Sequence, residues 1–192
     1  MDEMPVVAPE SFMPIVRDQV EDAVRKVMEA VNAAPPGKLI SASEEAVRNI
    51  TADLRKSLFQ AALQCRVDAA EAALPRPIDA QTGKNKRHKG RQQTTVLTIN
   101  GRVALQRIRW YSPDGSTVPV DALIQPAGER VTPGVRELAC RLNHDAASFD
   151  KTAANLARAA QFQMSGEQLR QRVEAEGKRV LAAQKAKAID SH

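Results

Sequence analysis

Residues 94–111 read TTVLTINGRVALQRIRWY, two runs of β-type residues on either side of Asn100-Gly101. An Asn-Gly pair between such runs is typical of a β-hairpin with a type I′ turn. The sequence SPDGS at 112–116 predicts a second tight turn, and TVPVDALI at 117–124 predicts a short third strand. The middle of the chain is therefore expected to form a small antiparallel β-hairpin or three-strand element.

Helical periodicity precedes this element. Apolar residues at spacings of three and four predict one helix with Pro14 in its first turn and its end near Asn32. They predict a second helix that begins at an N-cap, Ser41, and ends before the prolines at 74–77. We expect the two helices to pack as an antiparallel helical hairpin within residues 1–78. The same apolar stripes could also form the seam of a homodimer.

Helical periodicity also returns after the predicted sheet. Thr132, Ser148 and Ser165 are expected to begin three helices. The third helix should turn three apolar residues inward: Leu169, Val173 and Val180. Three short helices with tight connections in residues 126–192 are typical of helix-turn-helix geometry. The fold class expected from the sequence is mainly α (α+β), with the β part and a basic arm in residues 79–125.

The bulk composition agrees with a helical fold. Hydrophobic residues make up 43% of the 192 residues, but aromatic residues only 3%, which favours helices packed through small side chains. Cys65 and Cys140 lie in helical patterns and are expected to be reduced core thiols. The N-terminus has no apolar signal-peptide core, and no apolar run approaches the length of a membrane span. We expect a cytoplasmic, nucleoid-associated protein without a membrane partner.

Positive charge is concentrated next to the predicted hairpin. The window from Lys84 to Arg109 holds eight Lys or Arg and no acidic residue, although the net charge of the chain is only +5. A basic loop at about 79–93, mobile when unbound, could follow phosphates or enter a minor groove. It could also be a solvated surface loop or bind RNA. The candidate DNA contacts in this window are Lys84, Lys86, Arg87, Lys89, Arg91, Arg102, Arg107 and Arg109.

The start of the third C-terminal helix is a second candidate DNA contact. Gln can bond adenine edges and Arg can bond guanine edges in the major groove. Arg and Gln on a helix are also common as solvated surface. The candidate residues are Gln168, Arg170, Gln171 and Arg172.

Catalytic and metal-binding patterns are absent from the sequence. His88, His144 and His192 are scattered, and no paired-cysteine, zinc-protease or phosphate-binding motif is present. No acidic triad for two-metal chemistry stands out. We therefore assign no catalytic residue, cofactor or metal ligand.

Residues 84–185 resemble the region before the catalytic domain in bacterial insertion-sequence transposases of the ISKra type. The similar segments occur in the family's order: LTINGRVALQRIRWYSPDGSTVPVDALI, TPGVRELACRL, SFDKTAANL and EQLRQRVEAEGKRV. The resemblance implies a helix-turn-helix and double-stranded DNA, the inverted-repeat ends of a mobile element, as ligand. Many family members carry a zinc knuckle where this chain reads YSPDGS without cysteine, so we expect no zinc.

The resemblance implies the DNA-binding N-terminal portion of a transposase. Family members continue into an RNase H-like domain that holds the catalytic carboxylates, and this sequence does not include one. We therefore expect no DNA cleavage or joining by this chain. The alternative is a regulatory or protein-interaction fragment that inhibits or pairs with a full-length transposase.

Overall fold

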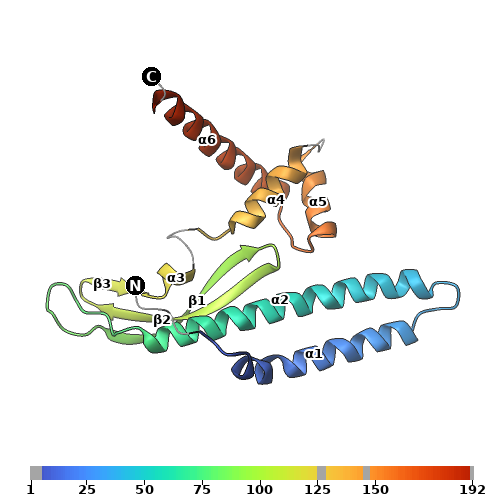
Figure 1. Cartoon of the computed structure of the whole chain (residues 1–192), viewed down its shortest axis with the longest axis horizontal. Coiled ribbons are helices and arrows are strands. Elements are labelled where there is room, and N and C mark those ends of the chain that lie inside the picture. The colour runs from blue at the N-terminus through green and yellow to red at the C-terminus, as the bar shows by residue number, and fades with distance from the viewer. Residues whose placement is uncertain (1–5, 125–128, 145–147, 191–192) are drawn as a thin grey trace. The chain divides into compact units, whose positions relative to one another are not determined.

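The computed structural model describes residues 6–124, 129–144 and 148–190 (Figure 1). These residues form a mixed α+β structure with a three-stranded antiparallel sheet. The chain divides into two compact units. The first comprises Met1–Thr95 and Val103–Glu129, and the second comprises Val96–Arg102 and Arg130–His192.

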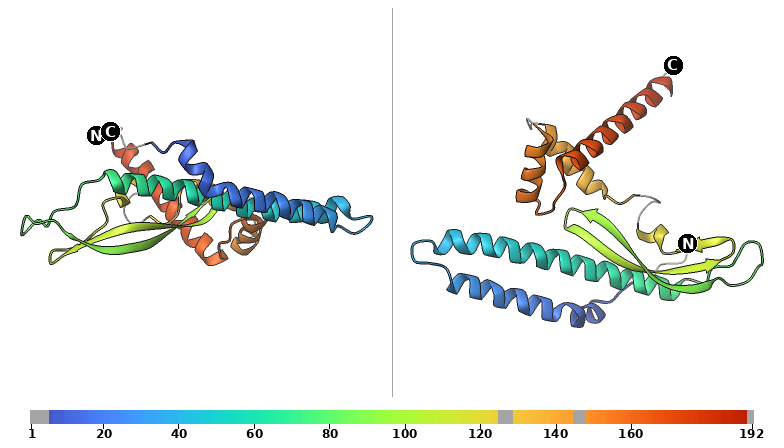
Figure 2. Two further views of the ribbon diagram at one scale, coloured as in Figure 1. Left: turned by 90° about the horizontal axis from the view of Figure 1, so that it is seen from below. Right: turned by 180° about the vertical axis from the view of Figure 1, so that it is seen from behind.

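Two long helices begin the first unit. Helix α1 (Pro9–Asn32) packs along α2 (Leu39–Ala73), and the two lie side by side in Figure 1 and in the right view of Figure 2. The predicted helical hairpin and the predicted ends of both helices are therefore confirmed.

The predicted starts of both helices are wrong. Pro9 occupies the first-turn position expected for Pro14, which lies inside α1, because Ala8 is extended and Pro9 has the φ that a first helical residue needs. Ser41 lies inside α2 and donates to the Lys38 carbonyl, so it is not an N-cap. A turn with Gly37 at φ +79° reverses the chain just before Lys38, and α2 can therefore begin earlier.

The sheet follows, in the order β1 (Arg87–Thr98), β2 (Gly101–Ser112) and β3 (Gly115–Thr117). The hairpin is confirmed, but its turn is not type I′. That turn requires positive φ at both central residues. Here Ile99 and Asn100 form the turn, and only the following Gly101 has positive φ, at +103°.

The third strand is shorter than predicted. Ser112 pairs with Gly115 across the tight turn, which confirms the turn, and Trp110 pairs with Thr117. The end of the predicted strand is instead a helical turn, α3 (Asp121–Ile124). The Asp121 N–H donates to the Val118 carbonyl and the Leu123 N–H to the Val120 carbonyl, and Val120 is 1% exposed within the core.

Helix α2 covers the part of β2 that the short β3 does not reach. Three backbone N–H groups of β2 donate to α2 side chains: Ala104 to Gln60 Oε1 (3.0 Å), Gln106 to Gln64 Oε1 (2.8 Å) and Ile108 to Glu71 Oε1. The Gln64 amide also donates to the Gln106 carbonyl at 2.9 Å. These bonds satisfy a strand edge that would otherwise be open to pairing with another chain. Apolar packing reinforces them through a core of Val67, Ala70, Val103, Leu105 and Val120.

The second unit contains three helices that pack against one another: α4 (Pro133–His144), α5 (Phe149–Ala159) and α6 (Gly166–Asp190). Their predicted starts are confirmed. Ser148 accepts a hydrogen bond from the Lys151 N–H, and Ser165 and Gln168 form a reciprocal capping box. The core centres on Val135, Leu156 and Leu169, which are all 0% exposed, and also includes Leu97 of the hairpin tip.

The prediction that Val180 faces this core is wrong, because its side chain is 54% exposed. Helices α4 and α5 have 12 and 11 residues, whereas α6 has 25. The shorter helices therefore cover only the first half of α6.

Cys65 and Cys140 are both free and half-buried. Within the described ranges, every helix is too short or too polar to cross a bilayer.

Candidate nucleic-acid interface

The basic segment is ordered, contrary to the prediction of a mobile loop at 79–93. Strand β1 already begins at Arg87. Before it, Asp79 is only 2% exposed and its carboxylate accepts hydrogen bonds from the N–H groups of Thr82 (2.8 Å) and Gln81 (2.9 Å). The Thr82 bond in particular lowers the pKa of Asp79. A carboxylate that accepts hydrogen bonds from the backbone N–H groups of the residues after it can stabilise a turn that has no apolar side chains.

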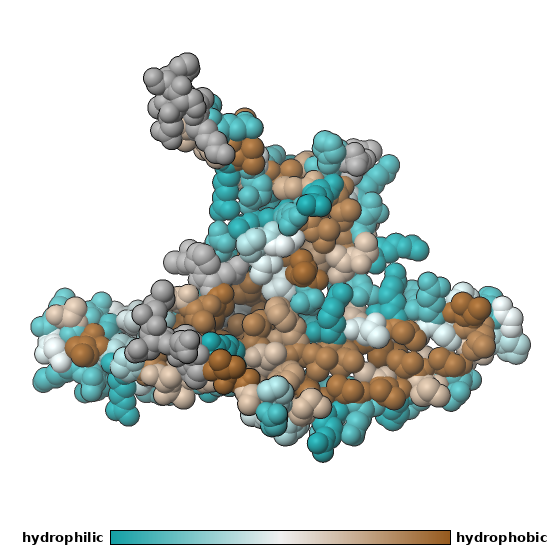
Figure 3. Space-filling model, viewed as in Figure 1, coloured by the Kyte–Doolittle hydropathy of each residue, from teal (hydrophilic) through white to brown (hydrophobic). Residues whose placement is uncertain are grey.

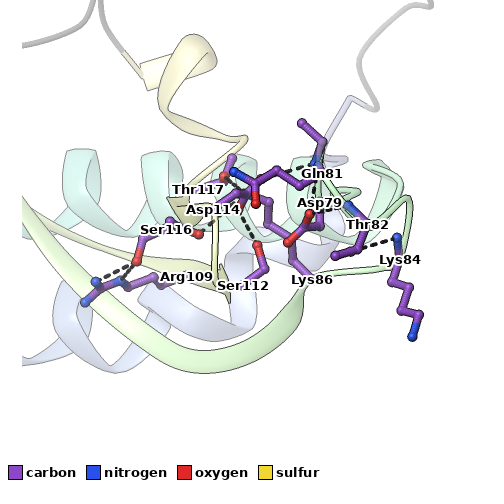
Figure 4. A network of polar contacts seen from close by, with 12 residues as sticks. Asp79, Gln81, Thr82, Lys84, Lys86, Arg109, Ser112, Asp114, Ser116 and Thr117 are labelled. Carbon is purple, nitrogen blue, oxygen red and sulfur yellow. Dashed lines mark hydrogen bonds and ion pairs between the residues drawn. The ribbon is translucent and has the colours of Figure 1, made fainter.

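Lys86 is buried within this turn and is not a free cation. Its Nζ donates to Asp114 Oδ1 at 2.7 Å and to Thr117 Oγ1 at 2.9 Å, and its side chain is only 8% exposed. The bond from Lys86, helped by one from Ser112, lowers the pKa of Asp114 to about 2. Figure 4 shows Lys86 reaching the β2–β3 turn, where it ties that turn to the 79–86 turn. Lys86 therefore has a structural role and is unavailable to a phosphate.

Three cations beside this turn remain exposed: Lys84, Arg87 and Lys89. Among the described residues, none of the three makes an ion pair with a carboxylate. Lys84 and Arg87 line one concave pocket together with Tyr111, which is 42% exposed. Lys89 Nζ lies 4.3 Å from the centroid of the Tyr111 ring, a cation–π contact. The arrangement offers phosphate-binding charge next to an accessible aromatic ring.

The other predicted cations of the first unit are engaged within the fold. Arg107 forms an ion pair with Asp121, and its side chain is only 12% exposed. Arg109 donates twice to Ser116 Oγ, at 2.7 and 3.0 Å. Arg91 pairs with Asp68 at 3.0 Å, but half of its side chain is exposed, so it could still reach an anion.

The second unit brings together two predicted DNA contacts that are distant in sequence. Arg102, exposed at the hairpin tip, and Gln168, in the first turn of α6, line the same open groove. Gln168 also serves the capping box through its side-chain oxygen.

Glutamates of α6 partly neutralise the other candidate residues at the start of this helix. Arg170 bonds both Glu167 and Glu174, and Gln171 donates to Glu167 at 2.8 Å. The bonds from Arg170 and Gln171 lower the pKa of Glu167 to about 2. Arg172 is exposed. Of the four predicted residues of α6, Arg172 is therefore the one most accessible to an anion.

The possible metal-binding and histidine side chains can be placed in the described part of the chain. No three His, Cys, Asp or Glu side chains there are close enough to hold a metal ion. His88 packs edge to face against Trp110, with ring centroids 5.6 Å apart. His144 ends α4, and His192 lies outside the described residues.

Sequence reasoning missed the acids that hold the basic segment in place. Asp79 and Asp114 are the nearest acidic residues on either side of the acid-free window, and each lies in a turn sequence. Their position was a signal that one of the nearby lysines could be buried, since a buried lysine needs a charged partner, but it did not indicate which lysine.

A scan against protein-family models finds no match for this chain, and a search of curated proteins finds none either.

Proposed function

We propose that this chain is the DNA-binding portion of a transposase and that it binds element-end DNA through the base of its β-hairpin. The observation that carries the proposal is the exposure of Lys84, Arg87 and Lys89 beside Tyr111, without carboxylate partners in the described part of the chain. The resemblance to ISKra-type transposases supports the same ligand. We propose no cutting or joining activity for this chain by itself.

A two-stranded β-ribbon has the width to enter a major groove. The ordered hairpin supports this mode of binding better than a mobile arm would, because its cations are held in place before the DNA arrives. Phosphate contacts position a protein on the duplex but carry no sequence information. Lys84, Arg87 and Lys89 would supply positioning, while selectivity would come from other residues.

Helix α6 is the second candidate reading element. Arg102 and Gln168 line one groove, so the hairpin tip and the helix start could contact neighbouring groups of one duplex. A helix-turn-helix connects its two helices by a turn of about three or four residues. The connection between α5 and α6, residues 160–165, is longer. We therefore rank α6 behind the hairpin base.

A regulatory fragment is the alternative function. A chain that binds element ends without catalysis would block a full-length transposase, and one that pairs with the transposase would act without DNA. The salt dependence of duplex binding separates DNA binding from a purely protein-directed role, because only phosphate contacts release counterions.

The test is a fluorescence-anisotropy titration of labelled duplex at several salt concentrations. The triple variant Lys84→Ala/Arg87→Ala/Lys89→Ala should lower the slope of log K against log[salt] by about 2.7, since each phosphate contact contributes about 0.9. The control Arg25→Ala/Lys26→Ala/Lys56→Ala removes the same charge from exposed positions on α1 and α2. Its slope should match the wild type. Absence of binding at low salt, or equal losses in both variants, would refute the proposal.

A further inference from the structure

The helical hairpin leaves part of its apolar surface exposed. In α1 only Val16 and Ala23 are buried, and in α2 only Val67 and Ala70. No residue of α2 from Leu39 to Arg66 is buried. The burial in α2 is confined to its last third, where the sheet packs against it. Two helices alone can bury only the strips that face each other, so the described residues of the first unit leave the rest of this apolar surface exposed.

The uncovered side of α1 can be located from residue spacing. Met13, Val24 and Met28 are 11 and four residues apart, which places them on one side of the helix. Their exposed fractions are 51%, 59% and 54%. Figure 3 shows apolar side chains in a row along α1 and α2 on the viewed face. The three residues span about four turns, with the exposed Arg17 on the same side between Met13 and Val24, so the exposed apolar residues form an interrupted row.

The row continues onto α2 at the closed end of the hairpin. Leu39 and Ile40 are 54% and 81% exposed, and with Val31 and Val47 they line an apolar groove. The uncovered face therefore involves both helices. Contiguous exposed apolar surface of this extent is typical of a protein interaction site.

Charge argues against nucleic acid as the occupant of this face. Helix α1 has five acidic and three basic residues, and α2 has five acidic and four basic residues, so the pair carries a net −3. The whole chain is +5, and the positive charge lies outside these helices. A net-negative pair of helices repels phosphates, so this face does not suit nucleic acid.

The size of the face fits a second copy of the same chain. The 24 residues of α1 span about 36 Å at 1.5 Å per residue. Two adjacent helices present a face about 20 Å wide. The product, about 700 Å² per chain, is close to the roughly 800 Å² that each partner buries in a stable interface.

We propose that the apolar face of α1 and α2 packs against the same face of a second copy, forming a homodimer built on four helices. A two-fold axis lets one face pack against itself. Each contact from one residue of the first copy to another residue of the second copy is then repeated with the copies exchanged. Four antiparallel helices bury the faces that two leave open. Such a dimer would carry two cationic hairpins, which suits the two ends of an element.

The proposal is tested by sedimentation equilibrium on the full chain with the matched single variants Val24→Lys and Ile15→Lys. Both residues lie on α1 and are at least half exposed, at 59% and 50%, so neither lysine is forced into the monomer core. They are nine residues apart, on opposite sides of the helix. Helical content from circular dichroism verifies that both variants fold.

The wild type should form dimers at micromolar concentration. Val24→Lys should weaken association at least tenfold, because it places a charge in the interface, whereas Ile15→Lys should associate like the wild type. A wild type that stays monomeric at about 100 µM, well above the Kd range of specific complexes, would overturn the proposal. Equal effects of the two lysines would overturn it as well. The readout needs no DNA, so it stands or fails separately from the proposed function.

Discussion

Replacing Leu156 by alanine tests whether the two compact units unfold independently. Leu156 is 0% exposed and lies in the core of the second unit with Val135 and Leu169. The hairpin belongs to both units, since its tip, Val96–Arg102, belongs to the second while the rest belongs to the first. Because the two units share the hairpin, they could unfold either independently or together.

The magnitude follows from burial. Replacing a fully buried leucine by alanine costs about 2 to 5 kcal/mol, and we take about 3 kcal/mol here. The second unit has about 70 residues, and at about 0.05 to 0.15 kcal/mol per residue its stability is about 3.5 to 10 kcal/mol. The expected loss is thus a large share of the free energy of unfolding of the second unit. At about 4 to 8 °C per kcal/mol, its melting temperature should fall by about 12 to 24 °C.

Tryptophan fluorescence reports on the first unit, which the substitution should leave unchanged. Trp110 is the single tryptophan and lies in the first unit. Thermal unfolding of Leu156→Ala should therefore show an early loss of helical circular dichroism and an unshifted tryptophan fluorescence transition. Val180→Ala, at a 54% exposed position of α6, is the control and should shift neither signal.

The reasoning is refuted if the Trp110 transition of Leu156→Ala falls together with the helical signal. That result would mean that the shared hairpin couples the units into one cooperative fold. An unchanged helical transition would refute the assignment of Leu156 to a core that the second unit depends on.

Three further substitutions test the two turns of the sheet and one glycine inside α6. The pKa of Asp114 is lowered from 3.8 to about 2, so its contribution to stability is present above pH 3.8 and is lost as the pH falls to about 2. Asp114→Asn should therefore reduce the difference in urea midpoint, followed by Trp110 fluorescence, between these two pH values, and an unchanged difference would contradict the assignment. Gly101→Ala should destabilise the hairpin by about 1 to 2 kcal/mol, since φ is +103° there. Gly177→Ala, in the open interior of α6, should instead stabilise by about 0.5 to 1 kcal/mol in chemical denaturation, and the same sign for both changes would contradict the backbone argument.

The candidate site was only partly predictable. The sequence shows where the positive charge is concentrated, and the structure leaves Lys84, Arg87 and Lys89 exposed. Lys86 carries the same charge in the same stretch but is buried against Asp114. Nothing local distinguishes it from its neighbours, because its partner lies 28 residues further along the chain.

Local chemistry determined the elements of this protein. Ser148 and Ser165 begin helices because their side chains cap the following backbone N–H groups, and Gly101 permits a turn because it lacks a Cβ atom. These interactions span at most three or four residues, so they can be read from the sequence.

Tertiary structure alone decided which groups are available at the surface. Gln64 satisfies both backbone groups of Gln106, which lies 42 residues away. The apolar stripe of α1 and α2 predicted their pairing, but only the packed structure shows how much of that stripe the pair leaves uncovered. The physical reason is the same in both cases. Burial and partnership depend on which distant segments meet in space, and no local pattern contains that information.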